Sequence, residues 1–182
     1  MVRRMAKRMT AQDWIDFALT TLAREGFAAL KADVLARKLG VSRGSFYWHF
    51  ADVEAFHAAI LKHWREVAAE RIIAEVEASA GGENPLQLLL RRVFVERLAL
   101  ESAVRSWANV DPAARAAVRA IDRRRIRYVQ GLLGSSGLSP DVARARAQIL
   151  YWAFLGFALS DRPLTRRQQQ AVLEEMLRMA SS

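Results

Sequence analysis

Residues 39–50 read LGVSRGSFYWHF, and this stretch decides the fold. Gly40 stands where a helix would end on a left-handed residue, and Ser42 offers a side-chain oxygen to the first free amides of a following helix. Phe46 and Phe50 lie four positions apart and share one helix face, while Gly44, Ser45 and Trp48 point roughly the opposite way. The stretch therefore predicts a helix-turn-helix with one face in a core and the other free to enter a groove.

Helical periodicity dominates the rest of the chain, and no alternating stretch of useful length indicates a strand. Thr10 with Asp13 three residues later is a capping-box start for the first helix, and Gly26 is a stop. Asp52 marks the start of a long fourth helix, which the Gly-Gly-x-Asn-Pro break ends. We therefore expect an all-α protein with helices over 11–25, 32–39, 43–50, 52–79, 85–100, 102–110, 112–133, 140–159 and 165–179.

The formal net charge is +9, and its distribution is uneven. Residues 1–50 carry nine Lys or Arg against four Asp or Glu, whereas the other 132 residues carry nineteen against fifteen. A polyanion is the natural partner of such a surplus, because each neutralised phosphate releases counterions. The alternative, a solvated basic surface, stays open from charge alone, and it is the usual explanation for the arginine-rich run at 122–127.

The pattern Ser42-x-Gly44-x-Phe46-Tyr47-x-His49-Phe50 resembles the recognition-helix signature of TetR-family transcriptional regulators. The similarity covers about residues 10–75 and includes Gly26-Phe27, Leu35-Ala36 and the turn at 39–42. It implies a three-helix helix-turn-helix DNA-binding domain, followed by a C-terminal helical regulatory and dimerisation domain. We place the first domain at residues 1–50 and the second at 51–182.

The resemblance also implies which residues meet DNA. Arg43, Gly44, Ser45 and Tyr47 would approach base edges, while Ser42, Trp48 and His49 would hold phosphates. Arg43 has an independent chemical case, because arginine is the usual bidentate reader of guanine O6 and N7.

The sequence departs from the family pattern at two positions. Lys31 replaces a common capping Ser or Thr, and Val53 replaces a frequent Lys or Arg. Lys31 could itself reach a phosphate. The basic segment at residues 3–8 is either a minor-groove arm or a tail without a role.

The C-terminal part contains candidates for a ligand pocket and for a dimer interface. Six aromatic residues could line a pocket between helices or simply pack in a core: Trp64, Phe94, Trp107, Tyr128, Tyr151 and Trp152. The run at 149–159 is apolar on all sides and must be covered from more than one direction. We expect a partner subunit to cover one side, through Ala153, Leu155, Gly156, Val172, Leu173, Met176 and Leu177.

Other function classes find little support in the sequence. The chain has no Cys, no secretory signal pattern and no apolar run long enough to span a bilayer, so we expect a soluble cytoplasmic protein. His57 and His63 are six residues apart, a poor spacing for zinc ligands on one helix. Neither a nucleophile elbow nor a phosphate loop or dinucleotide fingerprint is present. We therefore expect no enzyme and no cofactor.

The leading hypothesis is a homodimeric DNA-binding transcriptional regulator. The resemblance implies a repressor that a small-molecule effector releases from a palindromic operator. One alternative is a helix-turn-helix regulator that binds no small molecule. The other is a small helical enzyme, for which the sequence offers no site.

Overall fold

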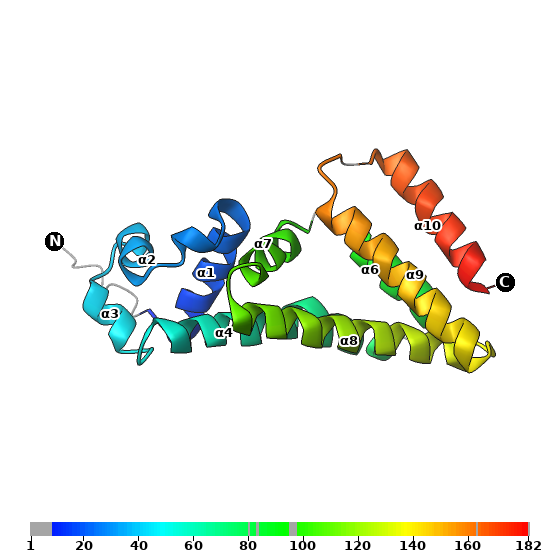
Figure 1. Cartoon of the computed structure of the whole chain (residues 1–182), viewed down its shortest axis with the longest axis horizontal. Helices are drawn as coiled ribbons and strands as arrows, with labels where there is room; N and C mark the ends of the chain where they lie inside the picture. The colour runs from blue at the N-terminus through cyan, green and yellow to red at the C-terminus, as the bar shows by residue number, and fades with distance from the viewer. Residues whose placement is uncertain (1–8, 80, 83, 95–97, 163, 182) are drawn as a thin grey trace.

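The structure, a computed structural model, describes residues 9–79, 81–82, 84–94, 98–162 and 164–181. Every regular element in this part of the chain is helical (Figure 1), which confirms the all-α class. The basic segment at 3–8 lies outside the described residues. No helix in the described ranges is both long and apolar enough to cross a membrane.

The N-terminal elements follow the sequence prediction closely. They are α1 (Ala11–Glu25), the 3-10 turn η1 (Phe27–Ala29), α2 (Ala32–Leu39), α3 (Arg43–Tyr47) and α4 (Val53–Arg65). Thr10 and Asp13 form the expected capping box, and the Asp52 side chain accepts a hydrogen bond from the Ala55 amide at 2.7 Å. Gly40 has φ +69°, the left-handed end that the sequence predicts for α2.

One local prediction is wrong: the Ser42 side chain makes no capping hydrogen bond. The Ser45 amide, which such a cap would bind, donates instead to the Ser42 carbonyl at 3.0 Å. The α-helical part of α3 is also short and ends at Tyr47. The Ser42 carbonyl thus accepts the hydrogen bond that the Ser42 side chain was expected to accept.

The C-terminal elements are η2 (Glu66–Glu70), α5 (Arg71–Ser79), α6 (Pro85–Val93), α7 (Ala99–Ala108), α8 (Pro112–Ser135), α9 (Pro140–Leu159) and α10 (Arg166–Ser181). The expected helix over 85–100 ends early, and α7 starts before residue 102. Gly134 lies inside α8 instead of ending it. Sequence periodicity did not predict η2, a π-helical segment that joins α4 to α5.

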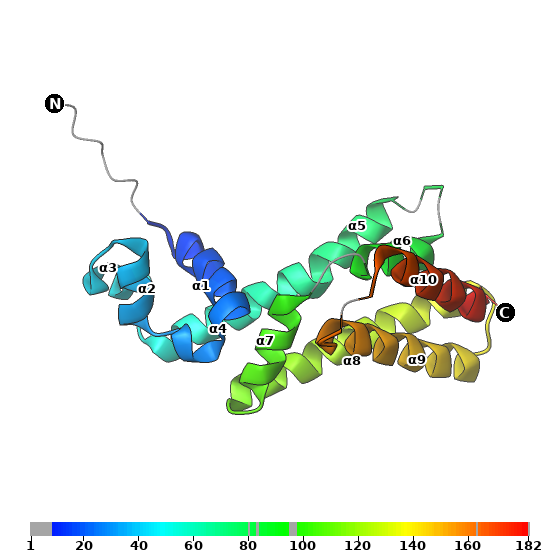
Figure 2. The same ribbon diagram turned by 90° about the horizontal axis from the view of Figure 1, so that it is seen from above.

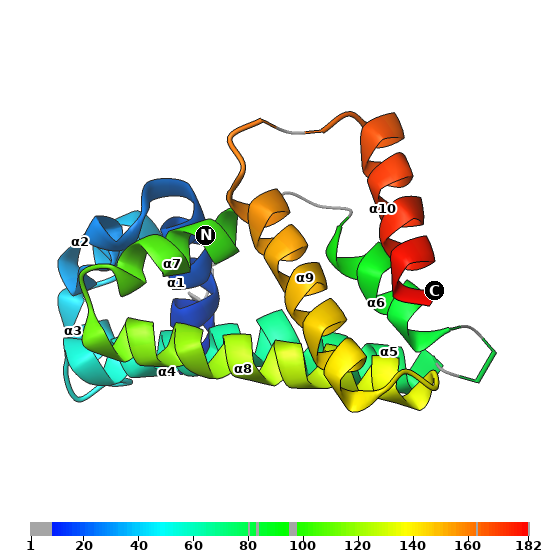
Figure 3. The same cartoon turned by 45° about the vertical axis from the view of Figure 1, so that its right-hand side comes forward.

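The helices form an elongated molecule with the helix-turn-helix of α2 and α3 at one end (Figure 1). α4, η2 and α5 form one continuous rod that runs beside α8, as the turned view in Figure 2 also shows. α7 packs on α1, α9 packs on α8, and α10 contacts α6 (Figure 3). The rod therefore connects the N-terminal helices directly to the C-terminal ones.

Two hydrophobic clusters hold these helices. The first is centred on Trp14 and Phe46, whose rings meet edge to face at 5.4 Å, and it extends to Trp107 and Ile121 of α7 and α8. The second joins α6, α8, α9 and α10. The N-terminal helices α1 to α3 therefore share their core with the C-terminal part of the chain, although the predicted domain boundary lies at residue 50.

Candidate nucleic-acid interface and ligand cavity

The buried face of α3 anchors the helix-turn-helix. Phe46 is fully buried and contacts Trp14, Phe50 and Phe56, with ring centroids 5.0 to 5.4 Å apart. The pairs of Phe46 with Trp14 and with Phe56 are edge to face, and such pairs add about 0.5–1.5 kcal/mol each beyond the burial of area. α3 is thus held by one side only, which leaves its opposite side at the surface.

The residues expected to bind DNA gather on that outer side. Tyr47 is 46% and Trp48 80% exposed, which is unusual for large aromatic side chains in a monomer. The Arg43 guanidinium donates to the Tyr47 hydroxyl at 3.2 Å, and this hydrogen bond raises the pKa of Arg43. The other residues of this group are exposed or partly buried: Lys31, Ser42, Gly44, Ser45 and His49.

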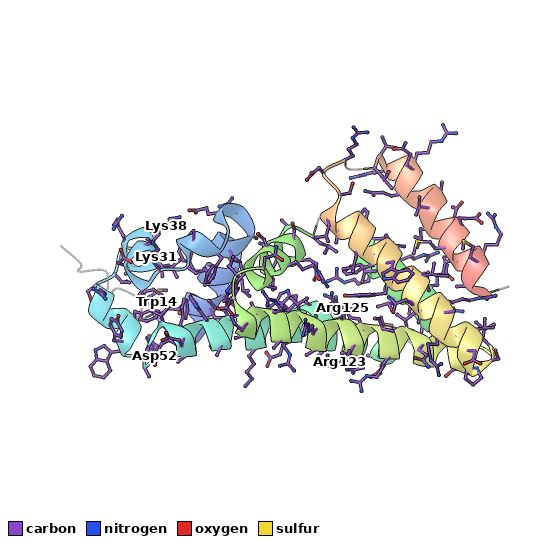
Figure 4. All side chains as sticks on the ribbon, viewed as in Figure 1. Trp14, Lys31, Lys38, Asp52, Arg123 and Arg125 are labelled. Carbon is purple, nitrogen blue, oxygen red and sulfur yellow. The ribbon has the colours of Figure 1, made fainter. Side chains whose placement is uncertain are left out.

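The charges beside α3 favour an anionic partner. Figure 4 shows Lys31 and Lys38 on the N-terminal end of the molecule. Lys38 forms an ion pair with Glu25, whereas Lys31 has no carboxylate at ion-pair distance within the described ranges. Exposed aromatic, hydroxyl and cationic groups on one short helix are the chemistry that phosphates and base edges require.

A cavity of about 460 Å³ lies between the rod, α6, α7, α8 and α9. This volume falls within the range of small-molecule sites. Four of the six aromatic residues predicted for a pocket line it: Trp64, Phe94, Tyr128 and Tyr151.

The other two predicted pocket residues lie elsewhere. Trp107 is buried in the first cluster, where it stacks on Phe27 at 4.7 Å and meets His57 edge to face. Trp152 is 62% exposed on α9. It follows Tyr151 by one residue, and about 100° of helical rotation turns it away from the cavity.

One wall of the cavity carries a buried ionic network that sequence reasoning missed. Glu101 of α7 is 4% exposed and accepts hydrogen bonds from Arg125 at 3.0 and 2.9 Å and from Arg105 at 2.8 Å. Arg105 also donates to Asp122 at 2.6 Å and to the Tyr151 hydroxyl at 2.8 Å, and Tyr151 donates to Asp122. No local sequence pattern indicated it, because its members come from α7, α8 and α9.

The network raises the pKa of its own basic and phenolic members. Burial by itself would lower the pKa of Arg105 and of Arg125, but the carboxylates of Asp122 and Glu101 outweigh it and raise both values. Burial, together with the hydrogen bond to Asp122, raises the pKa of Tyr151. The two arginines stay charged and the phenol stays neutral.

Two adjacent arginines of α8 hold the π-helical segment against the cavity. Arg125 donates to the Ala68 carbonyl at 3.0 Å, and Arg124 binds both carboxylate oxygens of Glu70 at 3.2 Å. Figure 4 places Arg125 on the inner side of α8 and Arg123 on the opposite side. π-Helical segments often occur at functional sites. Here η2 lines the cavity and directly follows the last residue of α4.

The residues expected at a dimer interface divide into two groups. Leu173 and Met176 are each 7% exposed and pack inside the second cluster of their own chain. At the surface, or only partly buried, are Ala153, Leu155, Gly156, Val172 and Leu177. Leu173 and Met176 are therefore corrected to intramolecular core residues, because α10 turns this face toward α6.

A second row of residues on α9 includes only one of the predicted interface residues, Gly156. Six small or apolar residues are exposed at alternating spacings of three and four. We call this row the α9 stripe: Val142, Ala145, Ile149, Trp152, Gly156 and Leu159. This spacing is typical of a helix that packs along another helix. The sequence contained this signal, but the apolar run masked it because neighbouring positions are equally apolar.

No group of three or more metal-ligating side chains comes together in the part of the chain that the structure describes. His57 contacts the Leu30 carbonyl at 3.3 Å, and His63 lies between Asp16 and Glu66. Both histidines therefore have structural partners at the packing of α4 on its neighbours.

The comparisons with known proteins agree with this architecture. Residues 15–60 match the family model of bacterial regulatory proteins of the tetR family. The match covers α2, α3 and most of α1 and α4. No curated protein sequence matches the chain.

Solved structures extend the similarity to the whole fold. A TetR-family transcriptional regulator from Rhodococcus sp. superposes with a TM-score of 0.72 at 16% identity, over 94% of this chain and 98% of that one. The multidrug binding protein EbrR, complexed with imidazole, gives 0.61 at 25% identity over 94% and 95%. A transcriptional regulator from Saccharomonospora viridis, in complex with choline, gives 0.68 at 14% over 92% and 95%.

Three findings agree on the kind of protein. They are the exposed face of the helix-turn-helix, the family match of residues 15–60 and the superposition of nearly the whole chain. Residues 15–60 are similar to the N-terminal region of the tetR family of bacterial regulatory proteins, and the chain has the all-α fold of solved TetR-family transcriptional regulators.

Proposed function

We propose that the protein is a homodimeric repressor that binds a palindromic operator and is released from it by a small molecule. The observation that carries the proposal is the outer face of α3, where Arg43, Tyr47 and Trp48 are exposed while Phe46 is fully buried. Residues 1–50 would act as the DNA-binding domain and residues 51–182 as the effector-binding and dimerisation domain. Its place of action would be the cytoplasm.

The N-terminus of α3 would enter the major groove. Arg43 and Tyr47 would face base edges with Gly44 and Ser45, and Ser42, Trp48, His49 and Lys31 would contact phosphates. The Arg43–Tyr47 hydrogen bond keeps both side chains on one side of α3 before DNA arrives. This preorganisation lowers the entropy cost of ordering them in the complex.

A second copy of the chain would cover the α9 stripe. A row of apolar residues at three- and four-residue spacing needs a helix of similar pattern, and the same row on a partner supplies one in a two-fold interface. Gly156 lies in this row and would let two helices approach closely. Val172 and Met179, which α10 exposes, would extend the contact.

The cavity would receive the effector. Its wall includes Val67, Ala68 and Ala69 of η2, which is continuous with α4 of the DNA-binding end. A ligand that binds one position of this rod better than another shifts the distance between the two recognition helices. The solved complexes of EbrR with imidazole and of the S. viridis regulator with choline support a ligand-binding role for this fold.

Selection of bound DNA from a random library tests the proposal. A palindromic site is expected, with half-sites one helical turn or a multiple of it apart. Nonspecific DNA recovery would contradict a sequence-specific regulator. If a specific palindrome is bound but no compound releases it, the alternative of a regulator without a small-molecule ligand holds instead.

Arg43→Ala should weaken operator binding by about 1–3 kcal/mol per half-site and flatten the preference at one base position, because a bidentate contact to guanine is lost. Arg123→Ala is the matched control, since Arg123 is exposed on α8 away from α3. Footprinting and repeated site selection measure both effects. Unchanged specificity in Arg43→Ala would rule out base reading by this residue.

Operator affinity should fall steeply with salt. For B-DNA, the slope of log K against log salt is about −0.9 per neutralised phosphate. Lys31→Ala should make this slope shallower by about 2, because a dimer carries the change twice, while the preferred sequence stays the same. Fluorescence anisotropy over a salt series gives the slope. A slope identical to that of the wild type would remove Lys31 from the phosphate contacts.

A further inference from the structure

We propose that the outer face of α8 is a second DNA-binding surface, which holds the phosphate backbone of a duplex without reading its sequence. Its contacts come from three arginines, Arg119, Arg123 and Arg127, which we call the α8 row. The inference goes beyond the proposed function, because these residues lie on a different element from α3 and their binding needs no operator.

The α8 row is a continuous cationic line. Its members are four positions apart, so each lies about 40° around the helix and about 6 Å along it from the one before. All three side chains are exposed, and Figure 4 shows Arg123 on the side of α8 opposite to Arg125. No ion pair within the described ranges includes a member of the row. Three guanidinium groups therefore face outward together.

The other charges of α8 have partners inside the molecule. Asp122 is the only acidic residue of α8, and it accepts from Arg105 in the buried network. Arg124 binds Glu70, and Arg115 donates to backbone carbonyls at the end of α7. The α8 row thus has no counter-charge on its own helix, and like charges at four-residue spacing destabilise a helix. An external anion would remove this repulsion.

The residues around the α8 row favour one class of partner. Outward positions beside it carry small residues, such as Ala116, Gly131 and Gly134, and no large apolar side chain is exposed on α8, all of which the structure describes. Protein interfaces depend on buried aromatic or aliphatic anchors, and membrane-bound helices depend on inserted apolar side chains. The row offers neither kind of anchor, so its affinity must come from charge.

Duplex DNA is the polyanion that suits such a surface. Each strand carries a phosphate about every 3.4 Å along the axis, so arginines about 6 Å apart meet phosphates in any register, and released counterions provide the affinity. The guanidinium fork matches the oxygens of a phosphate, and the small residues let the backbone come close. Contacts to phosphates alone carry no sequence information.

The α8 row lies apart from α3. α8 runs from the N-terminal helices toward the far end of the molecule (Figure 1), so a straight duplex across α3 does not follow it. DNA on the α8 row is therefore a second segment, from another duplex or from a distant part of the same one. A duplex of operator length meets α3 alone, and Arg123→Ala stays a control for that contact.

The test first removes the contacts of α3. Arg43→Ala with Tyr47→Ala gives an α3-blank protein, whose binding to a duplex of about 30 bp and random sequence is followed by fluorescence anisotropy over a salt series. Adding Arg119→Gln, Arg123→Gln and Arg127→Gln should weaken binding at least about 10-fold. The slope of log K against log salt should become shallower by about 2.7, because three phosphates per chain are no longer neutralised.

Arg91→Gln, Arg166→Gln and Arg167→Gln together are the matched control. They remove the same charge from exposed arginines of α6 and α10 that also lack an ion pair within the described ranges. This control should change the affinity less than about 3-fold. Equal losses in the two triple variants would assign the binding to net charge, and no loss in the α8 variant would remove the row from DNA binding; both results overturn the inference.

Lysine at the three positions of the α8 row separates charge from structure. These substitutions keep the charge and should keep most of the salt slope. In urea denaturation the Gln variant should be at least as stable as its parent, because repulsion along the helix is removed. A Lys variant that loses binding as fully as the Gln variant does would overturn the assignment to charge.

Two other polyanions test the class of partner. Phosphatidylglycerol vesicles and polyglutamate should bind the α3-blank protein at least about 10-fold more weakly than DNA at equal concentration of negative charge. If either binds as tightly as DNA, and loses that binding in the Gln variant, the surface belongs to a membrane or to an acidic protein and the inference is overturned.

The protein with an intact α3 should hold two duplexes at once. A duplex fixed to beads is loaded with protein, and a second, labelled duplex is then added. The wild type should retain the second duplex, whereas the Gln variant of the α8 row should bind only the first; failure of the wild type would overturn the inference. If selection finds no specific DNA but the α8 row still binds duplexes, the proposed function fails and this inference stands.

Discussion

Glu101→Ala is expected to lower the free energy of unfolding by about 3–5 kcal/mol, which makes it one of the most damaging single substitutions in the chain. Glu101 is 4% exposed and accepts from both Arg105 and Arg125. Arg105 keeps Asp122 as a partner, but Arg125 loses the one carboxylate that pairs with it among the described residues. Urea denaturation monitored by circular dichroism measures the loss.

Glu75→Ala is the matched control. Glu75 also pairs with an arginine of a neighbouring helix, Arg92, but both side chains are more than half exposed. Exposed pairs contribute at most about 1 kcal/mol, so the control should unfold nearly as the wild type does. The double variant Glu101→Leu with Arg125→Met should recover part of the lost stability, since it leaves no unpaired charge on that side of the network. Equal stability of Glu101→Ala and Glu75→Ala would refute the assignment.

Trp152→Glu should convert the proposed dimer into monomers and abolish tight binding to the proposed operator. A tryptophan at the centre of an interface commonly contributes at least about 2 kcal/mol, and a buried carboxylate adds its desolvation cost. The dimer dissociation constant should therefore rise by at least about 30-fold. Operator affinity should fall with it, because a monomer binds one half-site. Sedimentation velocity measures the dissociation of the dimer, and fluorescence anisotropy at the same protein concentrations measures the affinity for the operator.

Val110→Glu is the control that shows whether an added surface carboxylate alone affects the dimer. Val110 is 72% exposed at the end of α7, away from the α9 stripe, so its substitution should leave the dimer intact. Leu173→Glu should behave differently from both, because Leu173 packs inside its own chain and a charge there should unfold the second cluster. A wild type that is monomeric at micromolar concentration would reject the α9 stripe as a dimer interface, and so would a dimer that Trp152→Glu leaves unchanged.

Local sequence patterns predicted the helices well. Thr10 and Asp52 cap the helices at which the sequence placed them, because each cap accepts a hydrogen bond from an amide only three positions away. Gly40 ends α2 for an equally local reason. The exposure of Gly44 and Trp48 followed from helical geometry once Phe46 was assigned to the core.

The sequence by itself determined the all-α class, the helix-turn-helix and the outer face of α3, since these depend on interactions within one turn of helix. Only the tertiary structure decided that Trp107 packs with Phe27, that Trp152 faces outward and that Leu173 is intramolecular. It alone brought Glu101, Arg105, Asp122 and Arg125 together, from positions 4 to 24 residues apart. The physical reason is that burial and ion pairing between helices depend on how whole helices are rotated and packed, and a pattern within one helix does not specify that packing.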